Sequence, residues 1–432
     1  MLFIIYMWVF MAFLLMFIRP RWGVAIYLPF YILVPFLNEM GFFNYPILFA
    51  LLFHRKKSGK IVDRNIIIPF VFFFLSFLFF IPFQTGIDYS RQLYFWWFDV
   101  VGIFSFPIFI YYTTQIDPRS VYVIRKSLML CIFIAAVYGL LLTSLNGINP
   151  YVLYIHSLTG KGDMSYILNY SISDGSGRLF GRIFSCFKHP MLYAYFLGLS
   201  FIYLCYTRNL SKKIVTIVAF ILLILNIVFC GVRSVIGALI IAIVFYLFIG
   251  KRIKMSLFLI ILYIVFLMLI EYVPYLSDYF GSFTSDAQDS EIKGSSISMR
   301  FEQFEGCLKE IQDSPIVGKG YGWSVNYLAV KGVHPTMLAF ESLILSVLCN
   351  SGFVGVIIWA VFVYLFISKY RHHYKDSLVY ITTLVFYISF AMITGDYSYM
   401  KFFVLFLMIM LGEGRIRNKC NSIVSKPVIK MI

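Results

Sequence analysis

The chain has 432 residues, of which 61% are hydrophobic and only 13% are charged. Soluble globular proteins carry about 45–50% apolar and about 25% charged residues. So few charged side chains cannot cover a water-soluble surface, which excludes a soluble enzyme, a disordered chain and a coiled coil. The composition therefore predicts an integral membrane protein. The seven cysteines are odd in number and lie mostly in apolar runs, so we expect neither a disulfide framework nor a zinc site.

Apolar runs that approach the length of a membrane span recur along the whole chain. A spanning helix needs about 20 apolar residues, and the runs lack the alternation that is typical of a β-barrel. The predicted fold is all-α, a single polytopic membrane domain over residues 1–432 with 12 or 13 transmembrane helices. The candidate spans are 2–18, 22–37, 41–53, 65–83, 94–112, 121–143, 189–206, 213–230, 234–250, 255–272, 337–367, 377–393 and 399–413.

The loops between these spans alternate in charge. Seven loops hold 24 of the 36 Lys and Arg residues: 19–21, 54–64, 113–126, 207–213, 251–254, 368–376 and the tail from 414. All seven fall on one side of the predicted membrane, and cytoplasmic loops are rich in Lys and Arg. The net charge of +16 is therefore an orientation signal rather than a sign of nucleic-acid binding. It predicts a multi-pass protein with a cytoplasmic C-terminus.

Two long loops face the outer side, residues 144–188 and 273–336. The second contains SSISMRFEQFEGCLKEIQDSP, in which apolar residues recur at spacings of four, three, four and three. This pattern predicts an amphipathic helix near 297–312.

Four arginines on the outer side work against the charge bias of the loops. Arg178 and Arg182 lie four residues apart in the first long loop, Arg233 lies in a tight turn between two spans, and Arg300 begins the amphipathic helix. A charge in the membrane is costly unless it is paired or faces a wet cavity. Solvated loops, or side chains that extend to the interface, are the alternative. Because Arg binds phosphate oxygens bidentately, we interpret the set as an anion-binding site.

Two His-Pro pairs open spans on the same side, at His189 and His334. Pro favours the first helical turn, so each His is expected at a helix N-cap. Glu341 would then share a helical face with His334, about 10.5 Å along the axis. We predict His334 and Glu341 as the catalytic residues, with His334 as the base and Glu341 holding an arginine or the helix in place. The alternative is that His334 only caps the helix.

Further candidates lie at the same depth. Asp99 is an acid inside an apolar run, expected to pair with an arginine or to take part in catalysis. Lys319 and Tyr321 lie in VGKGYGW, whose glycines let the backbone approach a ligand closely. With His189 these residues are expected to support the site. Arginines, helix N-termini and a buried acid together suit an anionic headgroup whose lipid tail stays in the bilayer.

Four segments that carry these residues resemble the O-antigen polymerase and ligase superfamily of bacterial membrane proteins. They are GRIFSCFKHPMLYA, GVRSVIGAL, SMRFEQFEGCLKEIQDSPIVGKGYGW and HPTMLAFESLILSVLCNSGFVG. The resemblance implies a glycosyltransferase of the bacterial plasma (inner) membrane, active on the periplasmic face without a cofactor or metal. It implies transfer of a glycan from undecaprenyl diphosphate, with Arg178, Arg182, Arg233 and Arg300 as the diphosphate-binding residues.

The resemblance leaves more than one activity open. A polymerase of O-antigen or capsule repeat units, which extends another lipid-linked repeat, is the first interpretation. A ligase that transfers the glycan to lipid A core is the second, and a lipid-linked oligosaccharide flippase is a third of a different class. The intramembrane charges lie near the outer end only, which argues against a flippase. The expected partners are undecaprenyl diphosphate-linked oligosaccharide and membrane lipid, with a chain-length regulator protein as a further candidate and no nucleic acid.

Overall fold

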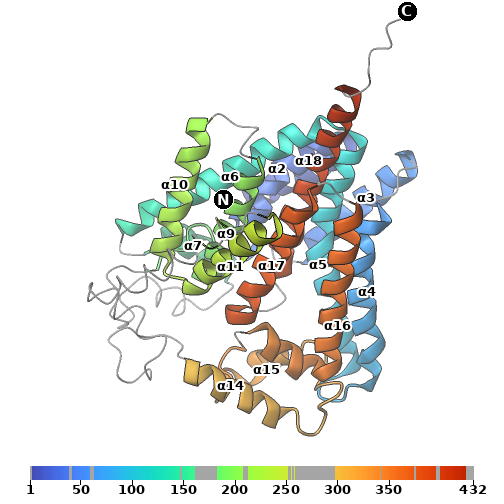
Figure 1. Cartoon of the computed structure of the whole chain (residues 1–432), viewed down its shortest axis with the longest axis vertical. Coiled ribbons are helices and arrows are strands. Elements are labelled where there is room, and N and C mark those ends of the chain that lie inside the picture. The colour runs from blue at the N-terminus through green and yellow to red at the C-terminus, as the bar shows by residue number, and fades with distance from the viewer. Residues whose placement is uncertain are drawn as a thin grey trace, which may run out of the picture.

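The protein is all-α, as predicted. The computed structural model describes residues 2–37, 41–58, 63–145, 148–160, 182–207, 213–251, 254, 257, 297–340, 342–373, 376–395 and 399–424. Within these residues helices pack into one bundle (Figure 1), and the only β pairing is an isolated bridge between His334 and Leu338.

Helices that are long and apolar enough to cross a membrane form the frame of the bundle. In the described part of the chain six meet that description: α4 (Arg64–Phe80, continued by the 3-10 turn Ile81–Phe83), α5 (Tyr89–Ile116), α6 (Ser120–Thr143), α9 (Pro190–Thr207), α16 (Leu343–His373) and α17 (Ser377–Thr394). Shorter or more polar helices complete it: α1 (Leu2–Ile18), α2 (Pro20–Leu33), α3 (Asn44–Ser58), α10 (Lys213–Cys230), α11 (Arg233–Ile249) and α18 (Met400–Val424). The chain is therefore a polytopic membrane protein. The predicted span 255–272 lies almost wholly outside the described residues.

The centre of the bundle is packed with aromatic side chains. On α9, Tyr195 is fully buried and stacks on Phe386 of α17, with ring centroids 5.5 Å apart. Tyr387 of α17 stacks in turn on Phe403 of α18 at 5.3 Å. Stacked and edge-on rings of this kind add to the stability that burial itself supplies.

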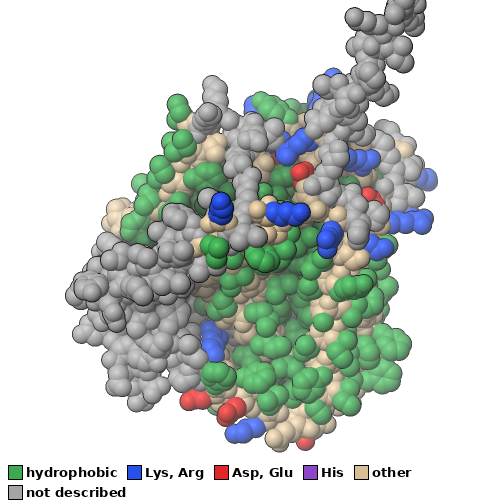
Figure 2. Space-filling model, viewed as in Figure 1, with side chains coloured by type: hydrophobic (Ala, Val, Ile, Leu, Met, Phe, Trp, Pro, Cys, Tyr) green, Lys and Arg blue, Asp and Glu red, His purple; other side chains and the backbone are tan. Residues whose placement is uncertain are grey.

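The outside of the bundle is apolar as well. Figure 2 shows hydrophobic side chains across its middle, while Lys and Arg gather at the end from which α18 emerges. Exposed side chains such as Phe79 (67%) and Ile214 (76%) suit lipid rather than water.

Shorter helices lie outside the predicted spans. The first predicted outer loop contains α7 (Pro150–Thr159), capped by Asn149, whose side chain accepts from the N–H of Val152. The predicted amphipathic helix is confirmed as α14 (Ile297–Glu310), and α15 (Trp323–Lys331) follows it. In Figure 1, α14 and α15 lie across the end of the bundle opposite the end of α18.

A buried ion pair lies toward the other end of the bundle. Glu413 of α18 is 3% exposed and accepts from Arg125 Nε of α6 at 2.8 Å and from the Tyr203 hydroxyl of α9 at 2.7 Å. The expectation that the intramembrane charges lie near the outer end only is therefore wrong. Because Glu413 Oε1 accepts from both groups, the pair ties α6, α9 and α18 together.

Candidate functional site

A break in α16 receives the chain that follows α14. Gly352 has φ +57° and ψ −155° inside α16, which frees backbone groups on either side of it. The N–H of Lys319 donates to the carbonyl of Cys349 at 2.8 Å, and the N–H of Phe353 donates to the carbonyl of Pro315 at 3.0 Å. The segment from Pro315 to Lys319 thus replaces the hydrogen bonds that the helix loses at its break.

Two positions at this break require glycine, because a side chain there would collide with the backbone of the facing segment. Gly318 has φ +70°, and a Cβ there would lie 2.5 Å from the nitrogen of Ser351. At Gly352 a Cβ would lie 2.4 Å from the carbonyl oxygen of Pro315. The N–H of Gly320 is also used, in a 3.0 Å bond to the carbonyl of Asn350. VGKGYGW therefore brings the backbone close to another helix.

We expect Gly352→Ala to lower the apparent melting temperature of the purified protein and its amount in the membrane. The left-handed φ and the steric contact should each oppose the methyl group, at a combined cost above about 1 kcal/mol. Gly237→Ala is the matched control, because nothing lies within 4 Å of a Cβ at that position. Equal melting temperatures for both variants would show that the break tolerates a side chain.

Two glutamine side chains also bind the glycine-rich segment VGKGYGW. The side-chain oxygens of Gln84 and Gln92 both accept from the N–H of Tyr321 at 3.0 Å. Gln84 Nε2 also donates to the carbonyl of Asn350 at 3.0 Å. Sequence reasoning missed both residues, although two amides that flank a short connection between apolar spans are a usable signal. Their partner lies more than 220 residues away along the chain, so no local pattern could identify it.

Asp99 of α5 is paired with a residue of the same turn. The Tyr321 hydroxyl donates to Asp99 Oδ2 at 3.0 Å. The structure thus brings together two of the predicted supporting residues.

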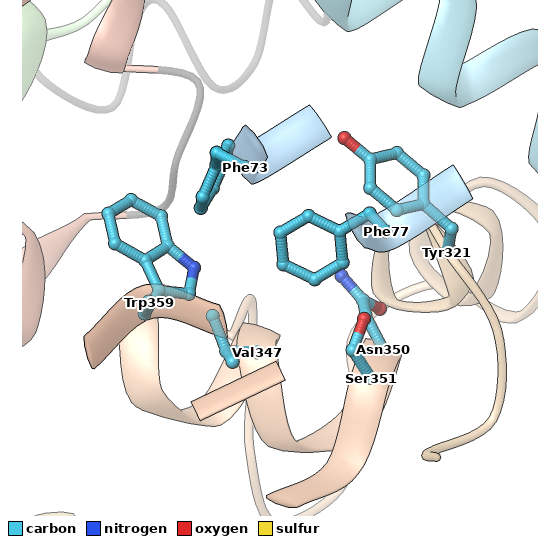
Figure 3. Close-up of a pocket in the computed structure, with 7 residues that line it drawn as sticks. All are labelled: Phe73, Phe77, Tyr321, Val347, Asn350, Ser351 and Trp359. Carbon is cyan, nitrogen blue, oxygen red and sulfur yellow. The ribbon is translucent and has the colours of Figure 1, made fainter. Parts of the chain in front are cut away.

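A small cavity lies beside Tyr321, between α4 and α16 (Figure 3). It has about 20 Å³ of space for water and is lined by Phe73, Phe77, Tyr321, Val347, Asn350, Ser351 and Trp359. Aromatic rings form its walls, and the side chains of Asn350 and Ser351 lie together at one end. A space of this size suits about one water molecule.

His334 lies in a turn and not at the start of a helix. Its N–H and carbonyl are both bonded to Leu338 at 3.0 Å, and α16 begins only at Leu343. Leu338 and Phe340 have φ of +53° and +55°, which a helix does not permit. The prediction that His334 and Glu341 share a helical face is therefore wrong. Glu341 itself lies outside the described residues.

The imidazole of His334 caps this turn. Its Nδ1 accepts from the N–H groups of Thr336 at 3.2 Å and Met337 at 3.1 Å. The neutral ring therefore carries its proton on Nε2. The ring is 5% exposed and lies against the rings of Tyr327 and Phe340, with centroids 5.0 and 5.6 Å away.

Glu310, the last residue of α14, faces this Nε2. Its Oε2 lies 3.7 Å from His334 Nε2, and its Oε1 accepts from Lys319 Nζ at 2.7 Å. We call Glu310, Lys319 and His334 the Glu310 site. The Glu310 side chain is 29% exposed, so the carboxylate borders open space. Sequence reasoning missed Glu310, although an acid in the last turn of a helix opposes the helix dipole and is a signal in itself.

A second set of polar and charged side chains lies at the start of α9. His189 Nδ1 accepts from the N–H of Met191 at 3.0 Å, as expected for an N-cap. Burial, together with the positive charges of Arg182 and Lys188, lowers the pKa of His189 to about 3. The ring is therefore neutral near pH 7, and the positive charge here belongs to Arg182 and Lys188.

Arg182 is placed near the start of α11. The Cys230 thiol donates to the carbonyls of Ile183 and Pro190, both at 3.1 Å, which fixes this segment against the end of α10. Arg233 follows three residues later as the first residue of α11. The structure thus brings Arg182 and the turn of Arg233 into one neighbourhood. Among the described residues, the buried Nε of Arg182 has no hydrogen-bond partner.

Arg300 is not part of the Glu310 site. Arg300 lies in the first turn of α14, where its Nη1 donates to Gln303 Oε1 at 3.1 Å. Ten residues separate it from Glu310, or roughly 15 Å along the helix. Arg178 lies outside the described residues.

Comparison with known proteins gives a family match over the part of the chain that carries the site. A search of the curated proteins finds no match to the chain. Within the described part of the chain, no group of three or more His, Cys, Asp and Glu side chains could hold a metal ion. Residues 191–360 match the family model described as O-antigen ligase, and they include the α16 break, the Glu310 site and the start of α11. This region of the chain is therefore similar to the O-antigen ligase family.

Proposed function

We propose that the protein polymerises the repeat units of a bacterial surface polysaccharide, an O-antigen or a capsule. It transfers glycan from undecaprenyl diphosphate to a lipid-linked acceptor on the outer face of the plasma membrane. The observation that carries the proposal is the Glu310 site, where a carboxylate and an imidazole lie 3.7 Å apart inside the matched region. The end rich in Lys and Arg, from which α18 emerges, is then cytoplasmic, and so is the C-terminus.

The reaction needs two kinds of assistance from the protein. The acceptor hydroxyl loses its proton to a base while its oxygen attacks the anomeric carbon of the donor sugar. The bond from that carbon to the diphosphate oxygen breaks, and the leaving undecaprenyl diphosphate takes the electron pair. Positive groups must stabilise the negative charge that develops on it.

The Glu310 site divides the first task between two residues. The Nδ1 lone pair of His334 is occupied by two backbone N–H groups, and Nε2 carries the ring proton in the neutral form. Glu310 Oε2 is the free acceptor beside it, so Glu310 takes the proton and His334 Nε2–H orients the acceptor oxygen. Lys319 Nζ binds Oε1 of Glu310 and leaves Oε2 facing His334. Glu341 remains a second candidate acid on the sequence alone.

The arginines serve the second task. Arg182 and Arg233, which lie in one neighbourhood, bind the diphosphate, with Arg178 and Arg300 as further candidates. A buried guanidinium nitrogen without a partner among the described residues favours this role for Arg182, because an arginine that faces no ligand would leave that nitrogen unsatisfied.

A ligase is the second candidate function. The matching family model is described as O-antigen ligase, which favours this alternative. The same Glu310 site would then activate a hydroxyl of lipid A core in place of a second repeat unit.

A flippase has less support. A headgroup that crossed the bundle would have to pass the closely stacked rings of Tyr195, Phe386, Tyr387 and Phe403 at its centre. In the charged pair toward the other end, Glu413 accepts from both Arg125 and Tyr203.

Deletion of the gene distinguishes these activities by the glycan that accumulates. Loss of a polymerase should leave single repeat units, which a ligase attaches or which stay on the lipid. Loss of a ligase should leave long polymer on undecaprenyl diphosphate and none on lipid A core. Loss of a flippase should leave lipid-linked units that a glycosidase added outside cannot reach. Wild-type polymer length in the deletion strain would contradict the polymerase proposal.

A further inference from the structure

Two cysteines meet where α14 packs on α16. Cys307 and Cys349 are both fully buried, and their sulfur atoms lie 3.4 Å apart. They belong to a small apolar cluster that is separate from the main core and includes Ile311, Met337 and Leu348. A disulfide bond is about 2.05 Å long, so the two sulfurs need to approach by little more than one ångström.

We propose that Cys307 and Cys349 form a disulfide that fastens α14 to α16. The two residues flank the elements that the Glu310 site needs. Glu310 follows Cys307 by three residues on α14, and the carbonyl of Cys349 accepts from Lys319 at 2.8 Å. A covalent bond at this point fixes the helix that carries Glu310 against the helix whose break receives Lys319.

The location of the pair supplies the second reason. The proposal rests on the proposed function, in which α14 lies on the outer side of the membrane. Disulfides form and persist in oxidising compartments of this kind. An apolar cluster of this size, apart from the main core, is also the kind of contact that a cross-link supports most.

The oxidation balances against a disulfide of another protein. The thiolate of one cysteine attacks a sulfur of the oxidant, a protein with a reactive disulfide, and releases one of its two thiols. The second cysteine then attacks the mixed disulfide and releases the other thiol. The pair loses two electrons and two protons, and the oxidant becomes a dithiol. Because both sulfurs are buried in the folded protein, the reaction takes place before α14 docks on α16.

Counting thiols tests the proposal on the full-length protein. Membranes are denatured in detergent with an excess of polyethylene glycol maleimide, with or without prior reduction. Each reactive thiol binds one polymer chain, so the shift of the protein band on a gel gives the number of thiols. The chain has seven cysteines, so we expect five reactive thiols before reduction and seven after it. Seven reactive thiols without reductant would overturn the proposal.

Single substitutions identify the pair. Cys307→Ser and Cys349→Ser should each show six reactive thiols whether or not the sample is reduced. The control Cys186→Ser, in a buried cysteine of another region, should show four before reduction and six after it. A cross-linked peptide that joins other cysteines would also overturn the assignment of the pair. If a variant fails to accumulate, the thiol count of the wild-type protein still decides whether a disulfide is present. The count is independent of glycan products, so its failure and that of the proposed polymerase are told apart.

Discussion

Replacement of Glu310 by Gln is expected to abolish long-chain glycan while the protein remains in the membrane. Gln has the size of Glu, but it cannot accept the proton of a hydroxyl or pair as an anion with Lys319, 2.7 Å away. The loss of a general base costs roughly 10²- to 10⁴-fold in rate. The measurement is the length distribution of surface glycan in a deletion strain that carries the variant, with the protein quantified in the same membranes.

Glu305→Gln is the matched control for this prediction. Glu305 lies on the same helix but is exposed to solvent, so its replacement should leave chain length unchanged. Long-chain glycan from Glu310→Gln at the wild-type level would remove Glu310 from the reaction.

His334→Asn separates the two roles that the structure gives this histidine. The side-chain oxygen of Asn can accept the N–H groups of Thr336 and Met337, so the turn should persist at a cost of well under ~1 kcal/mol. The Nε2–H that faces Glu310 is lost. We expect a folded protein that makes single repeat units only. Normal polymer from this variant would restrict His334 to capping.

The sequence predicts α14 well because its apolar stripe is local. The predicted helix near 297–312 differs from the observed Ile297–Glu310 by two residues at one end. The start of α16 was predicted too early because the residues after His334 are as apolar as a span. Their hydropathy does not distinguish a buried turn from a helix, and only the left-handed φ of Leu338 and Phe340 reveals the turn.

The site depends on contacts that no local pattern contains. Glu310 approaches His334 across 24 residues, through a glycine-rich segment whose shape follows from the break in α16. Gln84 and Gln92 reach Tyr321 from the connection between α4 and α5. The sequence predicted the residue types of an anion site at one end of the membrane, but the pairing of those residues is set by tertiary packing.

Replacement of Arg182 by Lys is expected to weaken use of the lipid-linked donor. The guanidinium presents a planar fork of donors to a diphosphate, whereas the ammonium of Lys is a point charge on a different geometry. Hydrogen bonds to charged groups contribute about 1.5–3 kcal/mol, so the donor KM should rise by roughly 10- to 100-fold. Initial rates of polymer formation in membrane vesicles, taken over a range of donor concentrations, measure this change.

The control for Arg182→Lys is Arg119→Lys, at an exposed arginine between α5 and α6. That variant should keep the wild-type KM, because Arg119 lies in one of the basic loops expected to face the cytoplasm. Because His189 is neutral near pH 7, its titration cannot replace the charge that Arg182 supplies. The donor KM of Arg182→Lys should therefore stay raised between pH 6 and 8. A wild-type KM for Arg182→Lys would show that the buried Nε of Arg182 meets no part of the diphosphate.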